Sequence, residues 1–116
     1  MDFSLTDDQK ALVESASRFA RERLAPDYRA REKAERIERE IAIEMGEMGL
    51  LGPELPESFG GLGVDCVTSG LLLEQIAYGD FNVSYVNLLT SLCGQIVANY
   101  ARPDIAFPLG WEVSKQ

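Results

Sequence analysis

Apolar and charged positions alternate with a helical period through most of this 116-residue chain, but charge disappears between Phe81 and Ala101. This stretch contains no Lys, Arg, Asp or Glu, and it is long enough to cross a bilayer, which takes about 20 helical residues. Eight small or polar residues interrupt it, namely Asn82, Ser84, Asn87, Thr90, Ser91, Gly94, Gln95 and Asn99. We therefore favour a largely buried helix of a globular protein over a membrane span.

The charge-free stretch has two different faces. Apolar residues recur at helical spacing at Tyr85, Leu88, Leu89, Leu92, Ile96 and Tyr100. Small or polar residues fall nearer another face, at Ser84, Asn87, Ser91 and Gly94. Such a helix can pack on its neighbours and also line a cavity.

The first helix is expected to begin after Thr6, which forms a capping box with Gln9 three residues later. Asp7 and Asp8 then lie at the positive end of the helix dipole. An amphipathic stripe follows, made of Leu12, Val13, Ala16, Phe19, Ala20 and Leu24. Pro26 is expected to end or kink this helix, because it lacks an N–H and clashes with the preceding turn.

The pattern predicts a second helix from Tyr28 to about Met48. Nearly every residue from Tyr28 to Glu40 is charged, which indicates a solvated surface held by local ion pairs. A one-sided apolar stripe follows at Ile37, Ile41, Met45 and Met48. Gly49 can take the left-handed conformation that ends a helix.

A loop is expected over residues 52–63, which contain two prolines and four glycines. Its G-G-L-G order matches no phosphate-binding fingerprint. A third helix capped by Asp65 is expected to reach about Tyr78, and Gly79-Asp80 then precedes a fourth helix running to about Tyr100. The chain is therefore predicted to be all-α, an up-down bundle of about four main helices over residues 1–105 with an irregular tail at 106–116.

Composition narrows the possible functions. The net charge of −8 argues against nucleic acid and against an anionic membrane surface as partners. The chain has no His, so a common general base and zinc ligand is missing, and no metal site is expected. Cys66 and Cys93 are expected to be buried free thiols, with a disulfide or a nucleophile as lesser alternatives. No signal peptide is visible at the amino end, which favours a cytoplasmic protein.

Three stretches together resemble the amino-terminal domain of the flavin-dependent acyl-CoA dehydrogenases. Met45–Asp65 reads M-G-E-M-G-L-L-G-P-E-L-P-E-S-F-G-G-L-G-V-D, and Glu74–Asp80 reads E-Q-I-A-Y-G-D. The opening F-S-L-T-D-D-Q-K-A-L-V, with the later F-A-R-E-R-L-A-P, is also typical. The resemblance covers about residues 2–105, with the motifs in the family's order and spacing.

The resemblance implies an oxidoreductase that removes two hydrogens across the Cα–Cβ bond of a fatty or cyclic acyl-CoA thioester. It further implies FAD as cofactor, an electron-transferring flavoprotein as partner and a homotetramer. The family's catalytic glutamate and most flavin contacts lie in later domains, so no catalytic or cofactor-binding residue is carried over. The positions that match the acyl-pocket lining are Tyr85, Leu88, Leu89 and Leu92, with Ser91 alongside. Ordinary core leucines are the alternative interpretation, and the polar side at Ser84, Asn87 and Ser91 would border the substrate cavity.

These implications lead to further expectations for the chain alone. Without the base and the flavin segments it should be inactive, and the apolar face of residues 85–100 should be partly exposed. The tail A-F-P-L-G-W-E-V-S-K-Q departs from the family pattern, which suggests a truncated or frame-altered product. Two other functions stay open: a stand-alone helical interaction module, and an acyl-CoA oxidase or flavin monooxygenase on the same scaffold.

Overall fold

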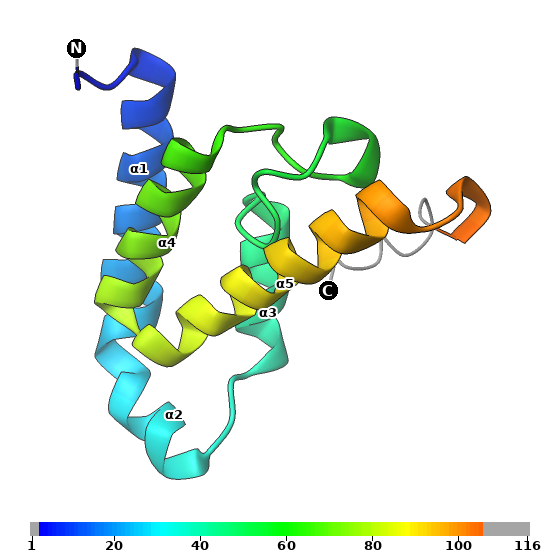
Figure 1. The fold of residues 1–116 in the computed structure, drawn as a ribbon. Coiled ribbons are helices and arrows are strands. Elements are labelled where there is room, and N and C mark those ends of the chain that lie inside the picture. Colours follow the sequence, from blue (N-terminus) through cyan, green and yellow to red (C-terminus); the bar gives the residue numbers. More distant parts are fainter. Residues whose placement is uncertain (1–2, 106–116) are drawn as a thin grey trace.

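The computed structural model describes residues 3–105, and nearly all of its regular structure is helical (Figure 1). The main helices are α1 (Asp7–Phe19), α2 (Tyr28–Ala34), α3 (Arg39–Glu47), α4 (Cys66–Gly79) and α5 (Phe81–Tyr100). Shorter turns are the π-helical η1 (Ala20–Leu24) and the 3-10 turns η2 (Ala25–Asp27) and η3 (Glu57–Phe59). The described residues contain no strand, so the all-α prediction is confirmed. The predicted irregular tail lies outside the described residues.

α1 and α4 lie side by side and run in the same direction, α3 runs in the opposite direction, and α5 crosses obliquely from the end of α4 (Figure 1). The two helix starts are joined by a chain of polar contacts. The predicted capping box is present, since the Thr6 hydroxyl accepts from the backbone N–H of Gln9 and the Gln9 side chain accepts from the N–H of Thr6. Gln9 Nε2 also donates to Thr68 Oγ1 at 2.9 Å, and Thr68 N donates to the cap residue Asp65.

The other ends of α1 and α4 meet at a close backbone approach. A Cβ added at Gly79 would lie 2.7 Å from the carbonyl oxygen of Ala20, so only glycine fits at this crossing. The α-helical pattern of α1 stops at Phe19, and the chain continues through η1 and η2, where Pro26 cannot donate a backbone hydrogen bond. The predicted helix break near Pro26 is therefore confirmed. The core between these elements comprises Ala16, Phe19, Ala20, Leu24, Ile41, Met45, Leu50, Leu51, Leu72, Ile76 and Val83.

The predicted continuous helix from Tyr28 to Met48 is wrong, because the structure breaks it into α2 and α3. Glu35 takes a left-handed conformation with φ of 56°, a strained state for a residue with a side chain. The break allows Ile37 to pack against the core at one end while Arg31 is buried at the other. The prediction of a wholly solvated charged surface is therefore wrong at Arg31. α3 ends at Glu47, close to the expected Met48, and Gly49 takes the left-handed conformation with φ of +76°.

The loop after α3 forms part of the interior. Leu50, Leu51 and Leu55 are buried, and backbone hydrogen bonds from Leu62 and Val64 to the carbonyl of Pro53 hold the loop closed. The predicted loop is thus confirmed, with η3 as its one helical turn among the described residues.

Both cysteines are free, as predicted, but they are exposed and not buried. Cys66 is the first residue of α4, where no neighbour covers it, and Cys93 lies on the outer side of α5. None of the helices described in residues 3–105 has the length and hydrophobicity needed to cross a membrane.

Candidate ligand-facing surface of α4 and α5

Asp80 alone separates α4 from α5, and it determines where α5 begins. Its Oδ1 accepts from the N–H groups of Asn82 at 2.9 Å and Val83 at 3.4 Å, which satisfies donors at the start of the helix. The predicted boundary is confirmed, and the chain changes direction sharply at this residue (Figure 1).

The small, polar face of α5 points into the domain and holds the loop that follows α3. Asn87 Nδ2 donates to the carbonyl oxygen of Leu50, and Gln95 Nε2 donates to that of Glu54 at 3.2 Å. A Cβ added at Gly94 would lie 2.8 Å from Leu55 Cδ1. The expectation that this face borders a cavity is therefore wrong at Asn87, because buried loop carbonyls need donors and α5 supplies them.

The apolar face of α5 points away from the domain. Its four predicted site residues share one exposed stripe, with exposed fractions of 47% for Tyr85, 44% for Leu88, 54% for Leu89 and 55% for Leu92. The alternative that these are ordinary core residues of this domain is wrong, and the predicted exposure of the apolar face is confirmed. Ser91 lies on the opposite, buried side, and its hydroxyl has no hydrogen-bond partner among the described residues.

A groove of about 310 Å³ extends this stripe onto α4. It is lined by Gly70, Leu73, Glu74, Ala77, Phe81, Ser84, Tyr85 and Leu88. Phe81 and Tyr85 form one wall, with ring centroids 5.3 Å apart and planes at 84°, a favourable edge-to-face contact. Of these lining residues, the sequence analysis had named Tyr85 and Leu88 as pocket lining and Ser84 as bordering the cavity, and it missed the contribution of α4.

Gly70 was the signal that could have indicated the α4 side. Glycine in a helix interior lowers helix stability by roughly 1 kcal/mol relative to alanine, so a glycine there usually has a structural reason. Gly79 and Gly94 have one, since a Cβ at either would press on Ala20 or Leu55. A Cβ at Gly70 would meet nothing within 4 Å, so packing among the described residues does not require glycine there. The missing side chain instead keeps the groove open.

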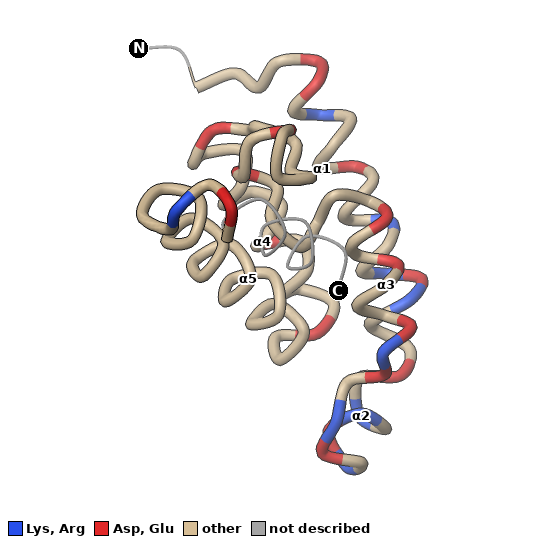
Figure 2. Tube along the Cα trace, turned by 90° about the vertical axis from the view of Figure 1, so that its right-hand side faces the viewer, with Lys and Arg blue, Asp and Glu red and all other residues tan. Residues whose placement is uncertain are grey.

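Charge is concentrated away from this surface. Figure 2 shows charged residues along α1, α2 and α3, whereas α5 is uncharged along its whole length. The clearest electrostatic effects also lie elsewhere: hydrogen bonds from Thr68 lower the pKa of Asp65, and a hydrogen bond from Arg23 lowers the pKa of Glu44. In the groove the ionisable side chains are Glu74 and Tyr85. The surface is thus mostly apolar and carries little charge.

The described residues contain no group of three or more His, Cys, Asp or Glu side chains arranged to hold a metal ion. The exposed side chains of this surface are mostly apolar, so they offer apolar contact and exclusion of water. Tyr85 is the side chain that combines an apolar ring with a polar hydroxyl along the exposed stripe between residues 85 and 92.

The sequence of this chain matches the model of a known protein family. Residues 6–105 match the family model "Acyl-CoA dehydrogenase, N-terminal domain". The chain belongs to the acyl-CoA dehydrogenase family. The match covers α1 to α5, so the amino-terminal acyl-CoA dehydrogenase fold includes both helices of the groove.

Relatives of known sequence and structure agree with this assignment. Benzylmalonyl-CoA dehydrogenase of Aromatoleum aromaticum is 36% identical to this chain over 94 residues. The aligned region covers 81% of this chain and 25% of the relative. The structure of butyryl-CoA dehydrogenase from Megasphaera elsdenii superposes with a TM-score of 0.86 at 25% identity, over 99% of this chain and 31% of that one.

A second solved structure also superposes on this chain. A chain in the structure of the electron transferring flavoprotein of Acidaminococcus fermentans, studied for flavin-based electron bifurcation, superposes with a TM-score of 0.91 at 28% identity. The alignment covers 99% of the present chain and 30% of that chain. The present chain therefore spans about a quarter of the curated relative and under a third of the two structural neighbours.

Proposed function

We propose that this chain supplies the helical wall of the acyl-binding site in an FAD-dependent acyl-CoA dehydrogenase. The observation that carries the proposal is the outward apolar stripe of α5, continuous with the groove against α4. A helix that turns Tyr85, Leu88, Leu89 and Leu92 away from its own core must meet another apolar group to remove that surface from water.

An acyl chain suits the groove in chemistry and in shape. Most of its lining is methyl, methylene and aromatic groups, with Glu74 as the charged side chain, and burying apolar area contributes about 25 cal/mol per Å². Gly70 leaves the α4 side of the groove open, where any larger side chain would occupy part of the space. Ser91 fits the proposed lining less well than the four apolar residues, because its side chain is buried on the other side of the helix.

The same surface does not fit the diphosphate of FAD. α5 carries no Lys or Arg, and the carboxylate of Glu74 in the groove repels phosphate. We therefore assign no flavin contact to this surface. In the full-length enzyme the proposed reaction removes two hydrogens across the Cα–Cβ bond, with FAD and the catalytic base held by other segments.

For these residues the proposed roles are binding and orientation. Leu88, Leu89 and Leu92 would hold the acyl chain along α5 and exclude water from the thioester end. The likeness to a chain in an electron transferring flavoprotein structure supports such a flavoprotein as redox partner of the full-length enzyme. Assembly into a homotetramer is proposed on the family resemblance.

The proposal can be tested with the isotopically labelled chain and two ligands, octanoyl-CoA and CoA without an acyl group. We expect octanoyl-CoA to shift the amide NMR signals of Gly70 and of residues 81–92, and CoA alone to leave them unchanged. Added FAD should stay unbound, and flavin that copurifies in stoichiometric amount would contradict our exclusion of flavin contacts.

Two matched variants provide the control for this experiment. Leu88→Lys places a charge in the groove and should abolish the shifts. Val67→Lys places the same charge on an exposed apolar residue at the start of α4, outside the groove, and should leave them intact. Equal binding by both variants, or equal shifts with CoA alone, would overturn the proposed acyl wall.

A further inference from the structure

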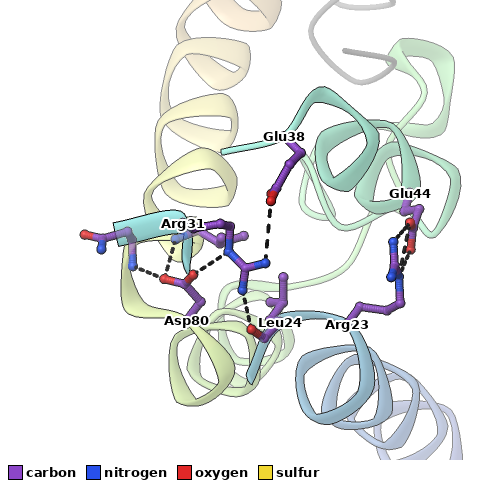
Figure 3. A network of polar contacts seen from close by, with 8 residues as sticks. Arg23, Leu24, Arg31, Glu38, Glu44 and Asp80 are labelled. Carbon is purple, nitrogen blue, oxygen red and sulfur yellow. Dashed lines mark hydrogen bonds and ion pairs between the residues drawn. The ribbon is translucent and has the colours of Figure 1, made fainter. Parts of the chain in front are cut away.

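Arg31 is the buried centre of a polar network that the charged pattern of α2 did not predict (Figure 3). Its exposed fraction is 5%, as is that of Asp80, and its Nε donates to Asp80 Oδ2 at 2.8 Å. Its Nη2 donates to the carbonyl oxygen of Leu24, and its Nη1 lies 3.9 Å from Glu38 Oε2. One guanidinium thus joins three partners that are 7 to 49 residues away in sequence.

Each of these partners lies at the boundary between two elements. Leu24 is the last residue of η1, Glu38 is the N-cap residue of α3, and Asp80 is the N-cap residue of α5. The two carboxylate oxygens of Asp80 have different partners: Oδ1 caps α5, and Oδ2 accepts a hydrogen bond from Arg31. The start of α5 is therefore attached directly to α2 and η1 through Arg31.

We infer that Arg31 is a positioning residue, which sets the direction of α5 relative to α4 and with it the orientation of the outward apolar stripe. α4 and α5 are joined by one residue, so the angle between them depends on the backbone conformation of Asp80 and on the contacts that hold this residue. The planar guanidinium, with donors in fixed directions, restricts that angle more than a flexible ammonium would. The inference goes beyond the proposed acyl-binding role, and its test uses no ligand, so either can fail alone.

A simpler account is that Arg31 only neutralises the buried Asp80. Replacing both members of a buried ion pair by neutral residues is often tolerated, whereas removing one is costly because the other charge stays buried. The two accounts differ in the double variant Arg31→Met with Asp80→Asn. Asn keeps an oxygen that can cap α5 and position 80 no longer carries a charge, but the links from residue 31 to Leu24 and Glu38 are lost.

The chain carries its own reporters for the helix angle. Cys66 at the start of α4 and Cys93 on α5 are both exposed, and the sequence contains no other cysteine. Spin labels on these two thiols allow the distance across the Asp80 joint to be measured by pulsed electron paramagnetic resonance. We expect one narrow distance distribution for the wild type and a broadened or shifted one for Arg31→Met.

The double variant decides between the two accounts. We expect it to regain much of the thermal stability lost in Arg31→Met while its distance distribution stays broad. A wild-type distribution in the double variant would overturn the positioning role and leave charge neutralisation. Arg23→Met is the matched control, because it removes the exposed pair between Arg23 and Glu44 and should leave the distribution unchanged.

If Arg31→Met does not fold, Arg31→Lys keeps the positive charge but lacks the fork that reaches Leu24, Glu38 and Asp80 together. We expect Arg31→Lys to fold and to broaden the distribution. A narrow wild-type distribution in Arg31→Lys would show that charge alone is sufficient and would also overturn the inference.

Discussion

α1 and α5 are both amphipathic, but they face the domain in opposite senses. In α1 the apolar side turns inward, so that Ala16 and Phe19 are buried and the charged residues are exposed. In α5 the apolar side turns outward, and the buried residues are Val83, Ser84, Asn87, Ser91 and Gly94. Helical periodicity therefore identifies which residues share a face, but it does not say which face is buried.

The reason for the reversal is the neighbour that each helix contacts. α1 packs on α4, whose inner side offers Leu72 and Ile76. α5 covers a loop whose carbonyl groups are not satisfied by helical hydrogen bonds, and amide side chains with a glycine suit that contact better than leucines. The outward leucines remain available for a ligand or for another part of the protein.

The largest expected contrast comes from the same substitution at two leucines. Leu24→Ala should lower the free energy of unfolding by about 2–5 kcal/mol, because it opens a cavity in the core. Leu92→Ala should change it by about 0.5 kcal/mol or less, because that side chain is 55% exposed. Chemical denaturation of the two variants measures both values. Similar losses would mean that the outward stripe of α5 is packed in solution.

A substitution that makes the inner face of α5 more apolar should also destabilise the chain. Asn87→Leu leaves the buried carbonyl of Leu50 without its donor, which costs about 1–3 kcal/mol. A helix buried by its apolar face would instead gain stability from this change. Denaturant melts of Asn87→Leu beside wild type provide the measurement, and increased stability would reverse our assignment of the buried face.

Replacing a glycine by alanine should change stability in opposite directions at Gly70 in α4 and at Gly94 in α5. Gly70→Ala should stabilise the chain by about 0.5–1 kcal/mol, since the added methyl meets open space and improves helix propensity. Gly94→Ala should destabilise it by about 1 kcal/mol, since the methyl presses on the fully buried Leu55. Thermal unfolding of both variants tests the pair, and the same sign for both would contradict it.

The smallest expected effect concerns the caps of the two parallel helices. Hydrogen bonds from Thr68 lower the pKa of Asp65 in the folded state, so its contribution is present above the unfolded value of about 3.9 and is lost as the pH falls through the folded pKa. The cap of α1, Thr6, does not titrate. Thermal midpoints from pH 6 down to pH 2 should therefore decline less steeply in Asp65→Asn than in wild type. Identical slopes would remove Asp65 from the acid response.

Local patterns predicted much of the fold correctly. The capping box at Thr6, the cap at Asp65 and the break at Pro26 depend on residues within one or two turns of each other, so they could be read from the sequence. The buried role of Arg31 could not, because its partner Asp80 is 49 residues away and nothing in the charged run distinguishes it from its neighbours.

The candidate surface, too, was predicted from the sequence only in part. Periodicity alone placed Tyr85, Leu88, Leu89 and Leu92 together on one face of a helix, and the structure confirms that grouping. Only the tertiary structure decided that this face is outward and that Gly70 and Leu73 of α4 extend it. The spacing of residues along a helix is determined by local backbone geometry, whereas the direction of a face depends on which neighbour offers the better contacts.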